Sequence, residues 1–414
     1  MRRAKPRDLV VGLDVGTTKI CAVITEPGPL GVLSVIGVGT APSRGLRRGV
    51  VVNIESTVEA IKTAVGEAEQ MAGVDVSGVF AGIAGGHIRG VNSRGVVPIT
   101  GRDREVSDAD VERVVEAARA INLPQDREII HVLPQNFIVD DGEGVREPIG
   151  MSGVRLEAEV HIVTGAVTSV QNVIRSVNRA GLTVQDIVLE PLASAEAVLH
   201  DDERELGVLA IDIGGGTTDV ALIRNGAVWH TAVLPLGGDH ISNDIAIGLR
   251  TPTADAEDIK KRYGCALTAL VPAEETVDVP SVGGRKPRQF SRQLLSEIIQ
   301  PRVEEIFTLV ARDLARAGFQ DAATAGVVVT GGTSIMEGVP ELAEGIFDQP
   351  VRRGVPIGIG GMADVIQSPI YATGAGLAIY GSRSRAPGEL SGAAGGTPVG
   401  RLARLVTGFL GDIF

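Results

Sequence analysis

Two stretches of the chain decide the fold: VVGLDVGTTKICAVI at residues 10–24 and VLAIDIGGGTTDVALI at residues 208–223. Each runs from an apolar strand through an aspartate, a glycine-rich turn and a Thr-Thr pair into a second apolar strand. We interpret them as diverged copies of one β-hairpin, the second with two extra residues in its turn. Because the copies lie about 200 residues apart, they predict two similar α/β lobes that face one another.

The composition fits a large α/β protein with an aliphatic core. Of the 414 residues, 44% are hydrophobic and only 3% are aromatic, and a chain of this length usually forms more than one core. The net charge of −12 disfavours nucleic-acid binding, which needs a basic face. The two cysteines, Cys21 and Cys265, argue against a disulfide framework and favour a reducing compartment.

Helices and strands alternate between the two hairpins. Apolar spacing predicts helices at 54–72, 108–121, 167–180 and 292–317, and strands at 79–84, 129–140, 154–163, 184–189 and 326–330. We expect Ser56 and Glu59 to form a capping box in the first helix, Ser107 to precede the second, and Pro301 to kink or break the last. Helices inserted between strands favour doubly wound sheets.

The turns of both hairpins predict phosphate binding, because a turn without Cβ atoms lets backbone N–H groups approach phosphate oxygens. Threonine hydroxyls would add donors, and Lys19 would add positive charge. Asp14 and Asp212 end their strands, where carboxylates can hold Mg²⁺ through water. The expected phosphate-binding residues are Asp14, Gly16, Thr17, Thr18 and Lys19 in the first hairpin, and Gly214, Gly215, Gly216, Thr217 and Thr218 in the second.

A third turn lies in VVVTGGTSIMEGV at residues 327–339. Gly331 and Gly332 end an apolar strand, and we expect Thr333 to start a helix. A Gly-Gly turn permits close approach of a flat ligand such as adenosine, and a helix N-terminus favours an anion. We place Met336 in the same site.

The two ends of the chain differ in character. The basic N-terminus is expected to be a solvated tail rather than a signal peptide, and no window holds the ~20 consecutive apolar residues of a spanning helix. Residues 382–400 predict a flexible linker with a reach of about 25 Å. Residues 401–414, RLARLVTGFLGDIF, predict an amphipathic helix with the apolar stripe Leu402, Leu405, Val406, Phe409, Leu410, Ile413 and Phe414.

A membrane surface is the favoured partner of this helix, since Phe and Leu crowd one face and arginines lie at its start. A protein groove and docking on its own fold are the alternatives. The expected localisation is therefore cytosolic or peripheral to a membrane.

The motifs resemble those of the actin-like ATPase superfamily, which includes actin, the Hsp70 ATPase domain, sugar kinases and MreB. DVGTTK, DIGGGTTD and TGGTS are similar to its two phosphate motifs and its adenosine motif. The resemblance implies ATP and Mg²⁺ as cofactors. It places Glu190 near the attacking water, Glu257 and Lys260 at the ribose and base, and Gly238 beside the nucleotide. Asp212 and Glu190 would be the catalytic residues of, at most, a slow ATPase.

Within the superfamily the chain most resembles the FtsA family of bacterial cell-division proteins. Residues of roughly 85–164 resemble the inserted FtsA subdomain, RRGVVVNIESTVEAI at 47–61 resembles the segment after the first strands, and the tail resembles the membrane-targeting helix. The resemblance implies an actin-like adaptor that polymerises on the cytoplasmic membrane face at the division septum. It would anchor FtsZ filaments there as a peripheral membrane protein.

The resemblance also implies partners. The FtsZ C-terminal peptide would bind the smaller subdomain of the second lobe, where EIIQPRVEEIF at 297–307 offers Arg302 and Glu305. A solvated helix face is the alternative interpretation of these two residues. Further copies of the chain would form the filament, and later division proteins would dock on 85–164.

The implied fold is an actin-like two-lobed ATPase fold of the α/β class with an FtsA-type inserted subdomain and a C-terminal amphipathic helix. We divide the chain into a first lobe core (8–84 and 165–200), the inserted subdomain (85–164), a second lobe core (201–243 and 320–381), its smaller subdomain (244–319), the linker (382–400) and the tail helix (401–414). A pilus-assembly protein of the PilM type is the main alternative. A sugar kinase would leave the tail and the insertion unexplained, an Hsp70 chaperone would need a larger C-terminal domain, and MreB has a different subdomain layout.

Overall fold

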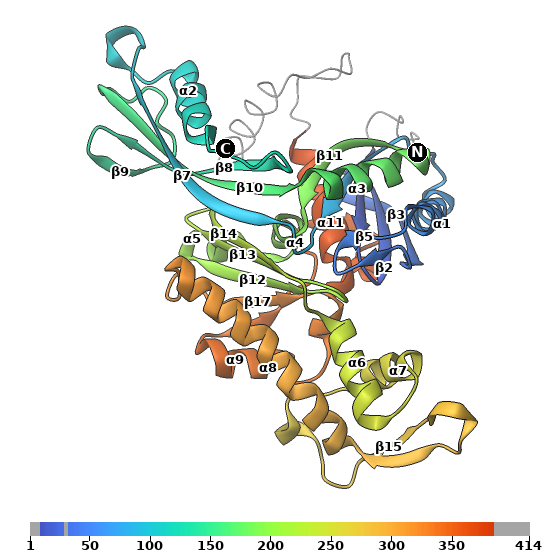
Figure 1. The fold of residues 1–414 in the computed structure, drawn as a ribbon. Helices are drawn as coiled ribbons and strands as arrows, with labels where there is room; N and C mark the ends of the chain where they lie inside the picture. The colour runs from blue at the N-terminus through green and yellow to red at the C-terminus, as the bar shows by residue number, and fades with distance from the viewer. Residues whose placement is uncertain (1–8, 29–31, 385–414) are drawn as a thin grey trace.

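The computed structural model describes residues 9–28 and 32–384. The predicted tail helix at 401–414 and the linker beyond Ser384 lie outside the described residues. Figure 1 shows two lobes built around separate sheets and a third unit that projects beside them. The third unit corresponds to the insertion expected between the halves of the first lobe.

The first lobe is built on a six-stranded sheet in the order β11-β6-β1-β2-β3-β19. Its elements are β1 (Val10–Val15), β2 (Lys19–Pro27), β3 (Leu33–Pro42), β6 (Gly78–Ile83), β11 (Thr183–Leu189), β19 (Ile359–Gly361), α1 (Ile54–Ala72) and α3 (Val167–Arg179), with the short pair β4 (Leu46–Arg47) and β5 (Val50–Val51). α1 and α3 bury apolar side chains against one face, while α11 (Ala372–Arg383) packs on β1 and on α4 (Glu190–Val198).

The second lobe is built on a five-stranded sheet in the order β14-β13-β12-β17-β18. Its strands are β12 (Val208–Ile213), β13 (Thr218–Arg224), β14 (Ala227–Leu234), β17 (Val327–Thr330) and β18 (Val351–Arg353), and its helices are α5 (Asp201–Leu206), α6 (Gly238–Leu249), α7 (Thr253–Tyr263), α8 (Arg292–Ala317) and α9 (Val339–Phe347). The hairpin of β15 (Thr276–Val279) and β16 (Arg288–Ser291) lies at the far end beside α6 and α7 (Figure 1).

One segment expected in the second lobe lies in the first. We assigned 320–381 to the second lobe core, but β19 pairs with β3, and Ile359 and Ile366 pack against Cys21 and Val35. α10 (Ala363–Ile366) belongs to this return. The chain therefore crosses back to the first lobe after β18. There it pairs with the edge of β3 and buries the apolar side chains beside that edge.

The inserted unit is a four-stranded sheet in the order β7-β10-β8-β9 with one helix on its face. Its elements are β7 (Arg89–Pro98), α2 (Asp108–Arg119), β8 (Arg127–Val139), β9 (Gly142–Val145) and β10 (Arg155–Ala166). α2 buries valines against the sheet and closes a separate core. This unit has its own core and touches both lobes through β8, β10 and β7.

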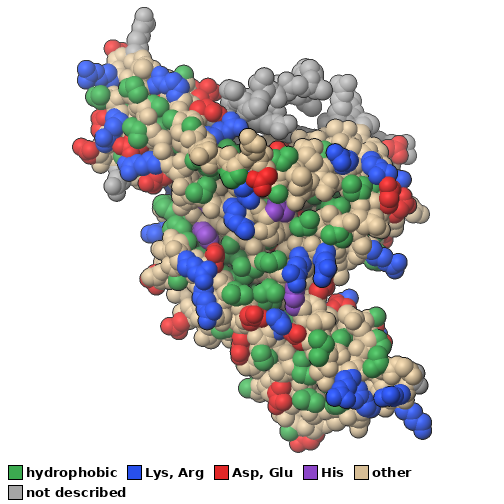
Figure 2. Space-filling model, viewed as in Figure 1, with side chains coloured by type: hydrophobic (Ala, Val, Ile, Leu, Met, Phe, Trp, Pro, Cys, Tyr) green, Lys and Arg blue, Asp and Glu red, His purple; other side chains and the backbone are tan. Residues whose placement is uncertain are grey.

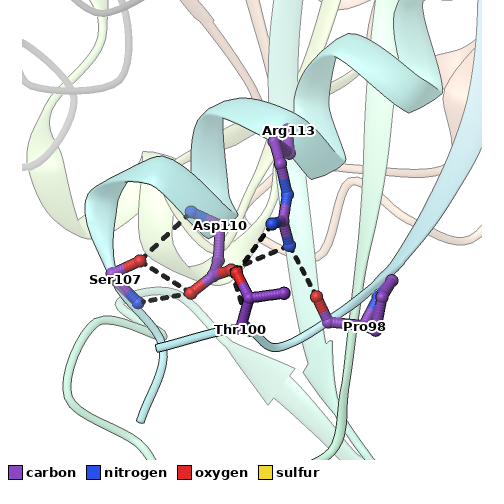
Figure 3. Close-up of polar contacts among 5 residues, drawn as sticks. All are labelled: Pro98, Thr100, Ser107, Asp110 and Arg113. Atoms are coloured by element: carbon purple, nitrogen blue, oxygen red, sulfur yellow. Dashed lines mark hydrogen bonds and ion pairs between the residues drawn. The ribbon is translucent and has the colours of Figure 1, made fainter. Parts of the chain in front are cut away.

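The start of α2 is fixed by a buried carboxylate, as Figure 3 shows. Asp110 Oδ2 accepts hydrogen bonds from the Ser107 backbone N–H and hydroxyl, and Oδ1 accepts from Thr100 and pairs with Arg113 at 2.8 Å. Asp110 is fully buried. Burial alone would raise its pKa, but the hydrogen bonds from Ser107 and Thr100 lower the pKa to about 2. Ser107 thus precedes this helix as predicted, and Asp110 completes the capping box.

Two local predictions need correction. Asn53, not Ser56, caps α1, since its side chain accepts from the Ser56 N–H at 3.0 Å, and asparagine is a preferred N-cap residue. α8 continues through Pro301 to Ala317 without a break. Buried residues on both sides of the proline, among them Ile299 and Val303, hold the helix against the second-lobe core and offset the missing hydrogen bond.

Replacing Asp110 with Asn should destabilise α2 by about 2 kcal/mol at neutral pH, since the charge that lowers the pKa is lost. The folded pKa lies below the unfolded value, so the stabilisation is present above pH ~4 and is lost as the pH falls towards 2. Hydrogen exchange over 108–119 measures the effect. Asp108→Asn, an exposed acid in the same turn, is the control and should change exchange little. Equal effects of the two substitutions would contradict this account.

Candidate functional site between the two lobes

The two predicted hairpins meet tip to tip across the interface of the lobes. A Cβ atom added to Gly215 would lie 1.6 Å from Thr18 Oγ1, and one added to Gly216 would lie 2.5 Å from Thr17 Oγ1. Thr18 Oγ1 also lies 3.5 Å from Asp239 Oδ1 of the second lobe. Glycine is therefore required in the second turn because the first turn occupies the space of a side chain. Figure 2 shows the surface hollowed between the first lobe and the part of the second lobe that carries α6 and α7.

The register corrects the expectation about the turns. Val15 pairs with Ile20 and Ile213 pairs with Thr218, so both turns have equal length, at residues 16–19 and 214–217. The second copy has no extra residues; the Thr-Thr pair stands two positions later in it. Thr218 consequently lies on β13, is fully buried, and donates its hydroxyl to Leu236 O at 2.9 Å. It is not placed to bind a phosphate.

Four carboxylates converge under the hairpins. Asp14 is the penultimate residue of β1, and Glu190 starts α4. Asp212 lies on β12, and Asp219 stands opposite it on β13. Each is less than a tenth exposed. Asp212 Oδ2 accepts from Ser194 Oγ at 2.5 Å and Thr373 Oγ1 at 3.1 Å. These two hydroxyls, from α4 and α11, fix the Asp212 side chain.

Lys19 supplies positive charge beside the acids. Its Nζ lies 3.8 Å from Asp14 Oδ2, donates to Ile370 O at 2.5 Å, and sits 5.1 Å from the centre of the Tyr371 ring. Burial would lower the pKa of Lys19, but the nearby Cys21 and Asp14 raise the pKa overall. The predicted cation thus reaches the site and is held by the segment that returns to the first lobe.

The acids repel one another in a buried setting. Burial, with a further contribution from Asp212, raises the pKa of Asp14 to about 6 despite the attraction of Lys19. Burial and the neighbouring carboxylates raise the pKa of Glu190 and of Asp219 well above their ordinary values. Clusters of this kind mark functional sites, because burying like charges together costs stability.

Asp219 is a site residue that the sequence analysis missed. Its Oδ2 accepts from Thr217 Oγ1 at 3.1 Å, while Oδ1 is buried without a hydrogen-bond partner in the described structure. The signal was present, since Asp219 directly follows the Thr-Thr pair. Its counterpart in the first hairpin is Cys21, which pairs with Asp14 in the same register. Ser194, Thr373 and the Ile370 carbonyl were also missed, since they come from distant elements.

The second lobe gathers the residues expected at the ribose and base. A Cβ on Gly238 would meet Thr333 Oγ1 at 2.6 Å and Lys260 Nζ at 3.1 Å. Lys260 donates to Gly238 O and pairs with Glu257 at 2.6 Å. Glu257 also binds Ser242 and Lys261. Burial opposes ionisation of Glu257, but Lys260 and these partners lower its pKa.

The turn at Gly331 only partly matches its prediction. Gly331 has φ +83°, and a Cβ there would lie 2.1 Å from Asp212 Oδ1, so the turn does approach the acids closely. Gly332 to Ile335 form a short 3₁₀ turn, however, and α9 starts only at Val339. Gly338, with φ +80°, separates the two. The helix that begins beside the hairpins is α6, at Gly238. Met336 packs near Gly264 on the same side.

Arg302 and Glu305 lie away from this cleft on α8. Arg302 binds Asp244 of α6 through Nε at 2.6 Å and Nη2 at 3.1 Å, and it also pairs with Glu305. The hydrogen bonds to Asp244 and the nearby acids raise the pKa of Arg302. One turn along α6, Ile247 is 69% exposed. The surface of α6 and α8 thus combines a fixed arginine with an exposed aliphatic side chain.

Comparison with known sequences decides the family. The family model described as "Cell division protein FtsA" matches residues 209–376, and "SHS2 domain inserted in FTSA" matches residues 85–164. FtsA of Pseudomonas aeruginosa is 56% identical over 380 residues, which cover 92% of this chain and 91% of the relative. FtsA of Escherichia coli K12 is 42% identical over 396 residues, 94% of each chain. The chain belongs to the FtsA family of cell division proteins.

Solved structures confirm the actin-like fold expected for an FtsA protein. A PilM-PilN type IV pilus biogenesis complex matches with a TM-score of 0.65 at 18% identity, covering 90% of this chain and 98% of the other. MreB 5 of Spiroplasma citri bound to AMPPNP matches with a TM-score of 0.54 at 17% identity, covering 90% and 95%. The high identity to FtsA favours cell division over the pilus alternative. Across residues 9–28 and 32–384, no helix combines the length and apolarity that crossing a bilayer requires.

Replacing Gly215 with Ala should push the two hairpins apart and cost about 1–3 kcal/mol, as overpacking does. Hydrogen exchange over 12–20 and 212–219 should rise together. Gly345→Ala, where a Cβ meets nothing within 4 Å, is the control. Adding Thr18→Ala should recover part of the loss, because it removes the clashing oxygen. Failure of the second substitution to help would disprove the proposed contact.

Proposed function

We propose that the chain binds ATP with Mg²⁺ between its two hairpins. The observation that carries this proposal is the meeting of the two glycine-rich turns over buried acids and Lys19. The backbone N–H groups of residues 16–18 and 214–216 would bind phosphates, and Gly238, Lys260 and Thr333 would bind the nucleoside, with Glu257, Gly331, Gly332 and Met336 around it. The solved MreB 5 structure with AMPPNP, which has the same fold, supports this assignment.

The residues present fit a magnesium ion. Asp219 Oδ1 is a buried oxygen without a partner, and the mutual repulsion of four carboxylates favours a cation. Within the described residues, no set of three or more His, Cys, Asp or Glu side chains forms a direct ligand group, so Asp14 and Asp212 would hold the ion through water. Magnesium supplies charge neutralisation at the phosphates when bound.

Hydrolysis would be slow and would use the chain's own carboxylates. Glu190 lies at the start of α4, where its carboxylate would orient a water, and the Ser194 and Thr373 hydroxyls keep Asp212 in place. The raised pKa of Glu190 makes its ionisation difficult before a cation binds. This arrangement favours stable nucleotide binding, with hydrolysis slow, over rapid turnover of ATP.

Lowering the pH from 7 to 5 should weaken the affinity for MgATP by about tenfold through Asp14, whose pKa of about 6 means that it takes up a proton in this range. In EDTA the same protonation should strengthen ATP binding, because it removes a negative charge near the phosphates. Titration with a fluorescent ATP analogue measures both slopes.

Asp14→Asn should abolish both the loss of MgATP affinity at low pH and the gain of ATP affinity in EDTA. Asp75→Asn, which removes an exposed acid of the first lobe, should keep both. A chain that fails to bind MgATP at any pH would disprove the nucleotide proposal. Identical slopes in the Asp14 variant would disprove only the role of Asp14.

We further propose that the chain is an adaptor between a membrane and FtsZ at the division septum. The amphipathic pattern of 401–414, with Leu402, Leu405, Val406, Phe409, Leu410, Ile413 and Phe414 on one stripe, supports lipid binding on the cytoplasmic face. Assembly of copies into a filament would multiply one weak anchor into avid attachment. The inserted unit, 85–164, would receive later division proteins.

The α6–α8 surface is the proposed site for the FtsZ C-terminal peptide. Arg302 is fixed by Asp244, so its charge is presented without the entropy cost of ordering a long side chain. Ile247, three residues after Asp244 on α6, is exposed. Gly248 lets α6 pack closely on α8, since a Cβ there would lie 2.8 Å from Ile298 Cδ1. Glu305 lies at the edge of this surface. An apolar peptide with an acidic residue matches this chemistry.

Co-sedimentation with anionic liposomes, with and without MgATP, tests the adaptor. The full chain should carry the FtsZ peptide into the pellet, whereas a chain ended at Gly400 should not. Ile247→Ser should weaken peptide capture about tenfold without changing lipid binding. Leu206→Ser, which removes an exposed aliphatic side chain elsewhere on the second lobe, is the matched control. If neither chain sediments, the tail binds something other than lipid and the adaptor proposal fails.

A further inference from the structure

The inserted unit reaches the candidate nucleotide site through one buried histidine. His131 lies on β8, in the core-facing part of the inserted sheet, and is only 3% exposed. Its Nε2 accepts the backbone N–H of Leu189 at 3.0 Å. Burial lowers the pKa of His131 to about 4, so the ring is neutral at pH 7 and Nε2 keeps the lone pair that accepts this hydrogen.

Leu189 stands at the junction of β11 and α4, directly before Glu190. It is the last residue of β11 and the N-cap residue of α4. The Leu189 side chain makes no capping hydrogen bond to the backbone N–H groups of the first turn of α4. β11 is an edge strand that pairs only with β6 in this sheet, so the Leu189 N–H finds its partner outside the sheet, on the inserted unit. The hydrogen bond therefore fixes the backbone that orients the Glu190 carboxylate.

Packing reinforces this single hydrogen bond. The His131 ring meets the Tyr380 ring of α11 edge to face, with centroids 6.2 Å apart. Leu133, two residues along the same strand and therefore on the same face, packs with Ala195 and Val198 of α4. Val132, between them, faces the opposite way into the core under α2. Alternate residues of β8 thus hold α4, while the residue between them holds the inserted unit together.

We propose that His131 is a positioning residue that couples the inserted unit to Glu190, so that displacement of this unit by a partner alters the nucleotide site, and nucleotide binding alters β8. The inference rests on the proposed nucleotide site. The coupling would act through one buried hydrogen bond, which joins two parts of the fold that have separate cores. A displacement of β8 would leave the Leu189 N–H buried without a partner, which is costly. Loss of this hydrogen bond on displacement of β8 would transmit the binding of a partner to the backbone at Glu190.

Hydrogen exchange of the full chain tests the hydrogen bond. His131→Phe keeps an aromatic ring against Tyr380 but removes the acceptor, and it should speed exchange in peptides covering 186–192 about tenfold. His131→Gln offers an amide oxygen at similar reach and should restore most of the protection. Val132→Ala is the matched control on the opposite face; it should loosen α2 and leave 186–192 unchanged. Unchanged exchange in the Phe variant, or equal effects of the Phe and Ala variants, would overturn the proposal.

The same samples test the coupling. MgATP should slow exchange over 127–139 about threefold in the natural sequence and leave it unaltered in His131→Phe, while the Gln variant responds. MgATP affinity is measured for each variant by titration. If MgATP fails to bind the natural sequence, the proposed function fails and takes the coupling with it. If MgATP binds but leaves 127–139 unchanged, or changes it equally in the Phe variant, the coupling alone is wrong.

Discussion

The contact between the two hairpin turns is the constraint on which the rest of the molecule depends. Thr17 and Thr18 occupy the space that side chains at Gly215 and Gly216 would need, so the lobes approach as closely as backbones allow. This approach places the ends of β1 and β12 opposite one another and brings their aspartates under the turns. A single methyl group at the tip would separate the strands that carry the charged residues. The glycines thus serve the tertiary contact as well as ligand access.

Closing the lobes buries negative charge. Asp14, Glu190, Asp212 and Asp219 are held together by the fold, with Lys19 as the cation beside them. Their raised pKa values express the free-energy cost of this arrangement. A bound ligand can offset such a cost, and a cation bound together with phosphates would do so by neutralising the carboxylates. The site is therefore strained electrostatically.

The inserted unit is fixed to both lobes by buried histidines with neutral rings. His131 binds the backbone before Glu190. His161 of β10 is hydrogen-bonded through Nδ1 to Asn92 Oδ1 at 2.6 Å and through Nε2 to Thr231 Oγ1 of β14 at 2.8 Å. Burial lowers the pKa of His161 to about 3, with a smaller contribution from His230. Polar contacts of this kind specify one orientation, whereas apolar packing alone tolerates sliding. The insertion is thus a structural part of the two-lobed body, although it has its own core.

The sequence by itself determined the hairpins, the alternation of helices and strands, and the identity of Asp14, Lys19 and Asp212, because strand periodicity and turn chemistry are local properties. It placed the insertion at 85–164, where the family model also matches. Only the tertiary structure decided which turn residues face the cleft: a register of equal turns buries Thr218 and brings Asp219 into the site. The partners of Lys19 and of the Leu189 N–H come from residues 370 and 131. Contacts between elements so distant in sequence follow from how the sheets pack, and no local pattern encodes them.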